Sequence, residues 1–285
     1  MDTKKTIDLN NLKKDSTLKF LYENPFGRII LKGITLPFVS SVVGKYMSSS
    51  LSKRRIKKFI TANGINMEEY EDREFQSFND FFTRKIKEGK RLLPQDKEVL
   101  FSPCDGKLSA YKINEDTVLP VKGSHYTISQ LLNNTELAEK YKDGYCLVFR
   151  LSVDDYHRYS YIDSGVKEEN VKIKGKLHTV QPIALEKSPV FIQNSREYTV
   201  IHTENFGDVV QVEVGALMVG KIKNHHGKGK VTRGGEKGMF LFGGSTIILL
   251  LNSNEVWVEE EFFENTKNHL ETVIKLGEPL GRKRK

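Results

Sequence analysis

Cysteine is scarce in this chain, and several common sequence signals are missing altogether. The two cysteines, Cys104 and Cys146, form neither a metal-ligand spacing nor a disulfide framework, so we expect a reducing cytoplasm and no metal. No apolar run reaches the ~18 residues that a membrane-spanning helix requires. The first 17 residues lack the apolar core of a signal peptide. No Walker loop, dinucleotide fingerprint or internal repeat is present, so the sequence gives no signal for a nucleotide site or a repeat fold.

The positive charge of the chain is confined to its first part. The 285 residues are 38% hydrophobic and 29% charged, which excludes a disordered chain and a membrane-embedded bundle. The formal net charge is +8. Residues 1–60 contain 13 Lys/Arg against 4 Asp/Glu, and the remainder contains 32 against 33. A basic segment of this kind meets either nucleic acid or an anionic membrane surface.

The residues around these charges favour the membrane. In the segment 26–47, apolar stretches alternate with single cations, and a Lys/Arg cluster follows at 53–58. This pattern is typical of a helix that lies in the headgroup layer of an anionic membrane. The alternative is an amphipathic helix packed on its own domain with a solvated basic face. We expect no nucleic-acid partner, because the positive charge is not interleaved with aromatic side chains on which bases could stack.

The chain divides near residue 95 into a helical and a β-rich part. Residues 1–95 contain helix formers and apolar residues at mixed spacings of three and four, most clearly at 53–59 and 77–90, where Ser77 or Asn79 could cap the helix. From about residue 100, short β-branched and aromatic runs alternate with turn residues, at 146–153, 171–173, 198–202, 209–214, 218–222, 246–251 and 256–258. We therefore predict an α+β protein, with a helical, membrane-facing region at 1–95 and a mostly antiparallel β catalytic domain at 96–285.

The most unusual stretch is residues 227–251, in which seven glycines precede Ser245 and an apolar strand. Glycine permits backbone angles that other residues resist, so Gly243 and Gly244 can hold a tight or strained turn. At the sterically open Gly244–Ser245 peptide, the serine hydroxyl can attack the preceding carbonyl in an N→O acyl shift. β-Elimination and hydrolysis would then leave a pyruvoyl group at position 245. Spacing alone is equally compatible with an ordinary β-turn before a strand.

Several motifs in the same order resemble those of one enzyme family. The turn FGGST resembles the self-cleavage motif of pyruvoyl-dependent phosphatidylserine decarboxylases, which is commonly Leu-Gly-Ser-Thr. Five further stretches of the chain resemble other family motifs: SFNDFFTRKIKEGKR (77–91), SPCDGKLS (102–109), VKGSHYTISQLL (121–132), DYHRYS (155–160) and VEVGALMVGKI (212–222). Because these motifs lie in register with the cleavage turn, they carry more weight together than any one of them alone.

The resemblance implies roles for individual residues. Ser245 would be the nucleophile of self-cleavage and the source of the pyruvoyl, and Asp105 would orient the histidine that activates it. His157 corresponds to the histidine tied to decarboxylation. The family's usual base lies three residues further on, where this chain has Ser160. We favour His178 as the replacement base, and the alternative is that His157 serves both steps.

The resemblance also implies a reaction and its partners. The chain would be a proenzyme that separates into chains 1–244 and 245–285, which remain together as a heterodimer. The mature enzyme would convert phosphatidylserine to phosphatidylethanolamine and CO2 through a Schiff base on the pyruvoyl, without a metal. We expect it at the cytoplasmic face of the cell membrane, bound peripherally to the anionic surface.

Three alternatives remain at this point. The first is a pyruvoyl decarboxylase for a soluble amino acid or a modified headgroup. The second is a serine hydrolase that uses Asp105, a histidine and Ser245 and stays in one piece. The third is a non-catalytic lipid-binding or nucleic-acid-binding module. Integrity of the chain separates the decarboxylases from the other two.

Overall fold

The computed structural model describes residues 4–9, 16–34, 37–114, 127–176, 178–179, 190–216, 221–243 and 245–285. The helices in these residues are α1 (Ser16–Glu23), α2 (Pro25–Ile34), α3 (Pro37–Met47), η1 (Ser50–Arg55), α4 (Ile56–Asn63), η2 (Met67–Glu69), α5 (Phe78–Phe82), α6 (Ile128–Leu132), α7 (Thr135–Glu139), α9 (Val190–Gln193) and α10 (Glu260–Lys267). The strands are β1 (Thr6–Asp8), β2 (Val99–Phe101), β3 (Gly106–Lys112), β4 (Tyr145–Leu151), β5 (Arg158–Ser160), β6 (Gly165–Lys167), β7 (Val171–Ile173), β8 (Arg196–Thr203), β9 (Asp208–Gly215), β10 (Ile222–Asn224), β11 (Gly229–Val231), β12 (Glu236–Phe240), β13 (Ser245–Leu251), β14 (Val256–Val258), β15 (Leu270–Ile274) and β16 (Pro279–Lys283).

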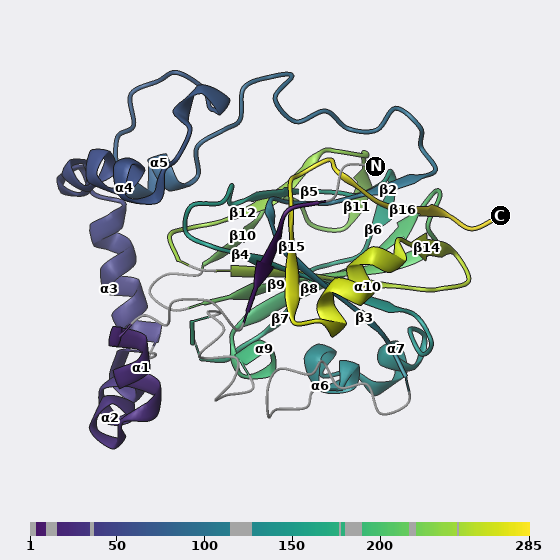
Figure 1. The fold of residues 1–285 in the computed structure, drawn as a ribbon, viewed down its shortest axis with the longest axis horizontal. Helices are drawn as coiled ribbons and strands as arrows, with labels where there is room; N and C mark the ends of the chain where they lie inside the picture. Colours follow the sequence, from purple (N-terminus) through teal and green to yellow (C-terminus); the bar gives the residue numbers. More distant parts are fainter. Residues whose placement is uncertain are drawn as a thin grey trace.

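One large antiparallel sheet forms the centre of the molecule (Figure 1). Its strand order is β1-β15-β3-β4-β13-β9-β8-β6-β11, and β7 pairs additionally with β8. The strand β13 lies in the middle, between β4 and β9, and all seven of its residues are buried. A strand covered on both faces is expected to be apolar throughout, as the sequence STIILLL is after its first two residues. The prediction of a mixed helical and antiparallel β protein is confirmed.

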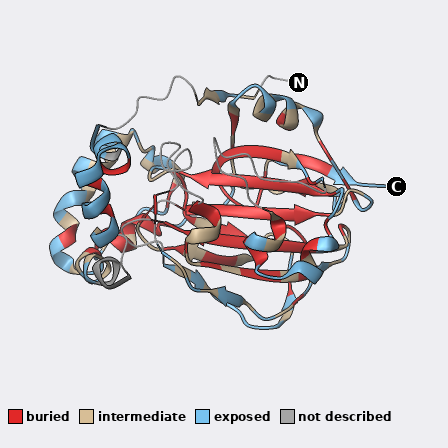
Figure 2. Cartoon of the chain, turned by 90° about the horizontal axis from the view of Figure 1, so that it is seen from below, coloured by how far each residue is buried: buried red, intermediate tan, exposed pale blue. Residues whose placement is uncertain are grey.

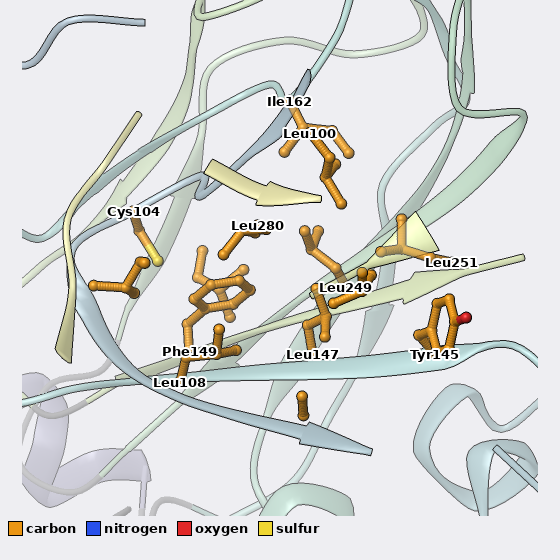
Figure 3. Packing of buried hydrophobic residues seen from close by; sticks show 14 of the residues in the cluster. Leu100, Cys104, Leu108, Tyr145, Leu147, Phe149, Ile162, Leu249, Leu251 and Leu280 are labelled. Atoms are coloured by element: carbon orange, nitrogen blue, oxygen red, sulfur yellow. The ribbon is translucent and has the colours of Figure 1, made fainter. Parts of the chain in front are cut away.

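Two small sheets cover one face of the large sheet. Their strand orders are β10-β12-β5 and β14-β16-β2. Between the layers lies an apolar cluster that includes Leu147, Phe149, Leu249 and Leu280 (Figure 3). Since successive strand residues point to opposite faces, Ile247, Leu249 and Leu251 supply this cluster while their neighbours face the other way.

Helices cover the opposite face. A second apolar cluster contains Ile248 and Leu250 of β13 together with residues of α6, α7 and α9. Leu21 and Leu31, from α1 and α2, also belong to it. Figure 2 shows that the central strands are buried almost throughout, whereas much of the surface of the N-terminal helices is exposed. The site described below lies where β13 begins.

The N-terminal helices α1, α2 and α3 form an arm that extends away from the sheets (Figure 1). The arm carries exposed large apolar side chains: Phe20, Phe26, Ile29, Ile30 and Val42, with Leu51 of η1 nearby in sequence. No helix in the described part of the chain is both long enough and apolar enough to cross a bilayer.

One short N-terminal segment is not helical, because Thr6–Asp8 forms β1 and pairs with β15 at the edge of the large sheet.

The helix predicted over 77–90 is much shorter in the structure. Ser77 caps it, since its side chain accepts a hydrogen bond from the backbone of Asp80, but the helix ends at Phe82. Beyond it, Lys85 and Lys87 exchange backbone hydrogen bonds with residues 71 and 69 in an extended arrangement. Tertiary pairing therefore overrides the helical propensity of this segment.

The predicted strands agree with the structure wherever it can be compared. The runs at 146–153, 171–173, 198–202, 209–214, 246–251 and 256–258 correspond to β4, β7, β8, β9, β13 and β14. Most of the run at 218–222 lies outside the described residues. The sequence did not predict β1, β2, β3, β5, β6, β11, β12, β15 and β16, several of which are only three residues long. Short strands with few β-branched residues give little periodic signal.

Candidate active site

Ser245 is the first residue of β13, and its side chain is fully enclosed. It lies opposite Leu151 of β4 and Gly215 of β9. It has no exposed surface, and its Oγ has no hydrogen-bond partner within the described structure. A buried hydroxyl normally finds a partner, so this one is not committed to a structural hydrogen bond. Gly244, on the other side of the predicted cut, lies outside the described residues.

The turn before Ser245 is held by α5. The backbone N–H of Phe242 donates to Oδ1 of Asn79 over 2.9 Å. The Phe242 ring packs edge-on against Phe78 and Phe82, with centroids 5.0 and 5.2 Å apart. Gly243 follows with φ at 139°, a region that side chains disfavour and glycine accepts. The segment just upstream of the predicted cut is thus fixed by a helix more than 160 residues earlier in the chain.

His157 is fully buried beside the same helix. Its ring lies 4.0 Å from that of Phe82, centroid to centroid. Its Nδ1 is 2.9 Å from the backbone carbonyl oxygen of Asp155, and its Nε2 has no partner. Burial lowers the pKa of His157 from 6.5 to about 3, so the ring is neutral at physiological pH. Because a carbonyl only accepts hydrogen bonds, Nδ1 must carry the proton and Nε2 presents a lone pair.

An ion pair stabilises the loop that presents His157. The Asp155 carboxylate accepts from Nζ of Lys107 and from the backbone N–H of Ser152, each over 2.6 Å. Burial raises the pKa of Asp155 above its ordinary value, against the opposing effect of Lys107. Since Lys107 lies two residues after Asp105, the Asp-Gly motif and the Tyr-His-Arg motif meet here, although 48 residues separate Lys107 from Asp155.

Asp105 is also fully buried, but its partners are cations. Its carboxylate accepts from Nε and Nη2 of Arg91, from Nζ of Lys275 and from the backbone of Leu276, over distances of 2.8 to 3.2 Å. Burial acts to raise the pKa of Asp105, and the hydrogen bonds and charges of Arg91 and Lys275 hold it below its ordinary value. Among the described residues, no histidine is hydrogen-bonded to it.

Ser160, the residue at the position of the family's usual histidine, lies beside the Asp-Gly motif. Its backbone N–H donates to the carbonyl of Pro103 over 2.9 Å. Its side chain is 7% exposed. A longer side chain at this position would begin close to the segment that contains Asp105, and serine is too short to replace an imidazole there.

His178 reaches the same end of the large sheet by a different route. Its backbone N–H and carbonyl are both bonded to the side chain of Asn194, which also donates to the carbonyl of Gly215 over 2.7 Å. Gly215 is the register partner of Ser245. On its other side, Nδ1 of His178 lies 3.3 Å from the hydroxyl of Tyr22 in α1. Burial, followed by the charge of Lys176, lowers the pKa of His178.

The structure thus brings parts of the predicted site together and adds residues to it. His157 contacts Phe82, which also contacts Phe242 in the turn before Ser245. His178 is connected through Asn194 to Gly215, the register partner of Ser245, while Asp105 adjoins the His157 loop through Lys107. The added residues are Asn79, Phe82, Tyr22 and Asn194. The first two belong to the motif at 77–91, to which the sequence assigned no role in the site, whereas nothing in the sequence marked Tyr22 or Asn194. Within the described residues, no cluster of three or more His, Cys, Asp or Glu side chains could hold a metal ion.

Comparison with known proteins gives a consistent answer. A family model described as phosphatidylserine decarboxylase matches residues 78–282. Phosphatidylserine decarboxylase proenzyme 2 of Clostridium acetobutylicum is 47% identical over 269 residues, which cover 94% of this chain and 92% of that protein. The phosphatidylserine decarboxylase proenzyme of Clostridium novyi is 43% identical over 285 residues, with 98% and 97% coverage. That of Clostridium botulinum (strain 657 / Type Ba4) is 42% identical over 283 residues, with 97% and 96% coverage.

Proposed function

This chain belongs to the phosphatidylserine decarboxylase family, and we propose that it is a proenzyme that cuts itself between Gly244 and Ser245. The mature enzyme decarboxylates phosphatidylserine to phosphatidylethanolamine. The observation that carries the proposal is the buried, unpartnered Oγ of Ser245 at the start of β13, directly after a glycine turn. The uncleaved serine hydrolase and the non-catalytic lipid-binding module are disfavoured by the family relationship.

Self-cleavage balances as an intramolecular acyl shift followed by elimination. Oγ of Ser245 attacks the carbonyl carbon of residue 244, and a base takes the hydroxyl proton while the amide nitrogen is released as an amine. Removal of the Cα proton of residue 245 then breaks the Cβ–Oγ bond. The upstream chain leaves as a carboxylate that contains Oγ, and residue 245 becomes dehydroalanine. Addition of water to the remaining dehydroalanine releases ammonia and leaves the pyruvoyl group.

We assign His157 as the base, in place of the His178 that the sequence favours. The neutral ring of His157 presents an Nε2 lone pair with no other partner. Strand alternation points Ser245 to the same face as Ile247 and Leu249, the face covered by β5 and β12, which adjoin His157. Tyr22, the partner of His178, belongs to the cluster on the opposite face. In the uncut chain Oγ of Ser245 and Nε2 of His157 are not hydrogen-bonded to each other, so the two groups must come into contact before the proton is transferred.

We propose that Asp105 supports this step through its charge. Burial lowers the pKa of His157, the hydrogen bond to the backbone of Asp155 opposes burial, and the negative Asp105 carboxylate adds a smaller effect in the same direction as that hydrogen bond. It therefore favours the imidazolium that forms when His157 takes the proton of Ser245. The same balance helps His157 later, as the group that returns a proton to the substrate carbon after CO2 leaves.

The residues around Ser245 fit a pyruvoyl group. Oγ of Ser245 and Nε2 of His157 are both buried, and neither has a hydrogen-bond partner among the described residues. When present, the pyruvoyl supplies a carbonyl that takes up the amine of phosphatidylserine and the electron pair left by CO2. The chain's own contribution is to exclude water and to hold the proton donor in place.

The two product chains are expected to stay together as a heterodimer. The chain 245–285 would contain β13, α10, β14, β15 and β16. Its strand β13 is paired on both sides with strands of the chain 1–244, and β15 and β16 pair with β3 and β2. Cutting one peptide bond leaves these ladders and their buried apolar side chains in place. The boundary near residue 95, between a membrane-associating region and the catalytic domain, is part of the same proposal.

The N-terminal arm is the part of the proenzyme that would meet the membrane. Phe26 and Ile29 of α2 are 66% and 65% exposed, and Leu51 of η1 is 66% exposed. Apolar side chains with cations nearby, such as Arg28 and Lys32, suit an anionic lipid surface. We propose that the enzyme binds peripherally through this arm at the cytoplasmic face of the cell membrane, where its lipid substrate resides.

Intact mass under denaturing conditions tests the proposal. Wild type should give two chains that divide after Gly244, and the smaller chain should react with carbonyl reagents and lack a free amine at its start. The variant Ser245→Ala should stay in one piece. A wild-type protein that remains uncut while it hydrolyses esters would contradict the proposal and support the serine hydrolase.

The choice of base has its own test. His157→Ala should abolish self-cleavage, and His178→Ala should leave it measurable. If His178→Ala alone blocks the cut, the assignment of the base returns to His178.

A further inference from the structure

Three buried cations in the described structure have no carboxylate partner: Arg84, Lys167 and Arg196. The Nζ of Lys167 is bonded to three backbone carbonyls, and every side-chain nitrogen of Arg196 donates to at least one. These two cations are therefore satisfied by the protein itself. Arg84 is different, because two of its three nitrogens have no partner.

The environment of Arg84 leaves its charge uncompensated. Only Nη2 is bonded, to the hydroxyl of Tyr70 over 3.2 Å and to the carbonyls of Asp154 and Asp155 over 3.1 and 3.5 Å. The guanidinium lies over the rings of Tyr70 and Phe81, 4.2 and 5.0 Å from their centroids. Nε and Nη1 have neither solvent nor an acceptor. A desolvated cation with free donors is costly unless an anion completes it.

Arg84 lies next to the proposed active site. The carbonyl of Asp155, which accepts from Nη2 of Arg84, also accepts from Nδ1 of His157. The positive charge of Arg84 is close enough to lower the pKa of His157. An anion bound at the free donors of Arg84 would therefore lie beside the imidazole. Arg84 is the fourth residue of the Phe-Phe-x-Arg segment, to which the mechanism above gives no chemical role.

We propose that Arg84 binds the phosphodiester of the phosphatidylserine headgroup. This inference rests on the proposed function. The headgroup offers two anions, the phosphodiester and the carboxylate. A cation held against the carboxylate would oppose the reaction, because that negative charge leaves the carboxylate as CO2 departs, and the enzyme would stabilise the substrate more than the transition state. The phosphodiester keeps its charge throughout, so binding it positions the headgroup without slowing the chemistry.

The uncut chain is closed around this site. Arg84, His157 and Ser245 each have 0% exposure. A lipid headgroup therefore reaches Arg84 only after self-cleavage has separated Ser245 from the preceding turn. The order of events predicts that the phosphodiester site forms with the mature enzyme and is absent from Ser245→Ala.

Two soluble probes separate the two anions. Glycerophosphoethanolamine contains the phosphodiester and the amine but no carboxylate, and O-methylserine contains the amine and the carboxylate but no phosphate. Each is tested as an inhibitor of CO2 release from phosphatidylserine in mixed micelles. In fully processed wild type, glycerophosphoethanolamine should be the stronger inhibitor. In Arg84→Gln its inhibition constant should rise about 10- to 100-fold, the range for a lost hydrogen bond to a charged group, while that of O-methylserine stays the same.

Arg73→Gln is the matched control. Arg73 lies shortly before the Phe-Phe-x-Arg segment and pairs with Asp80 at the surface, with its side chain 36% exposed. The Arg73→Gln variant should have the wild-type inhibition constants for both probes and the wild-type rate of CO2 release. Arg84→Lys keeps the charge with a different donor geometry. Its inhibition constant for glycerophosphoethanolamine should therefore lie between those of wild type and Arg84→Gln.

Equal inhibition of wild type by both probes overturns the assignment of Arg84 to the phosphodiester. This result needs no variant, so the assignment can be tested even if Arg84→Gln fails to fold. Unchanged inhibition of Arg84→Gln by glycerophosphoethanolamine overturns it as well. Weakened inhibition by O-methylserine alone assigns Arg84 to the carboxylate instead. Failure of the proposed function is distinguishable, because wild type would then show a single uncut chain by intact mass.

Discussion

The buried ion pair between Glu213 and Lys237 gives the sharpest stability prediction. Both side chains have no exposed surface, and the Lys237 Nζ lies 2.7 Å from the Glu213 carboxylate. Burial raises the pKa of Glu213 and lowers that of Lys237, so each charge depends on the other. Lys237→Met leaves a buried carboxylate with only the amide of Asn224 as its donor. Removing one partner of a buried pair costs about 3–5 kcal/mol.

Removing both charges should cost less than removing one. In Glu213→Leu/Lys237→Met no charge is left unpaired, and the main loss is the two hydrogen bonds that Asn224 makes to the pair. At about 1 kcal/mol each, the double variant should be destabilised by about 2 kcal/mol. Asn224 keeps its bonds to Tyr159 and Glu197.

The measurement is urea unfolding followed by circular dichroism, in a Ser245→Ala background that keeps one chain. The free energies of unfolding of the two single variants and the double variant form a double-mutant cycle. A double variant that is destabilised by the sum of the single effects would refute the reasoning, since it would mean that neither charge depends on its partner.

Three further predictions concern the membrane, acid stability and processing. Replacing both Phe26 and Ile29 by Ser should weaken binding to anionic vesicles about 30-fold, because about 2 kcal/mol of apolar burial is lost. The control Trp257→Ser, which removes a 44% exposed ring from β14, should leave vesicle binding unchanged. Equal effects of the two changes in a vesicle sedimentation assay would contradict the role of the arm. Because the pKa of His157 falls from 6.5 to about 3 on folding, the unfolded chain binds a proton first, and stability should decrease as the pH falls from 6.5 towards 3. In His157→Leu the melting temperature should fall less steeply over this interval, and an unchanged slope would exclude the contribution. Asn79→Leu should slow self-cleavage, because it removes the acceptor that fixes the turn at Phe242; processing at the wild-type rate by gel densitometry would argue against that contact.

The order of motifs along the chain was sufficient to identify the family, because the cleavage turn and its accompanying segments are local sequence features. The apolar composition of β13 after its first two residues was likewise readable, since a strand that is covered on both faces is mostly apolar. The buried Gln211 and Glu213 of β9 do not follow this rule. Charge counts located the basic N-terminal region without any structure. The short extent of α5 was not readable, because contacts with residues 69 and 71 end the helix.

The choice between the two histidines shows where sequence reasoning stops. By sequence, His178 and His157 were both available to replace the imidazole missing at Ser160. The tautomer of His157 depends on a carbonyl two residues away, and its unpartnered Nε2 depends on burial that Phe82 and the covering sheet provide. These are properties of a three-dimensional environment, and no spacing along the chain encodes them.

What the sequence by itself determined is the chemistry available: a serine after a glycine turn, the candidate carboxylate and imidazoles, and a basic apolar arm. What only the tertiary structure decided is which of these groups face one another. Asp105 proves to be bonded to Arg91 and Lys275, and Arg84 is buried with free donors beside His157. The physical reason is that local propensity acts over a few residues, whereas burial and pairing join residues that are 70 to 170 positions apart.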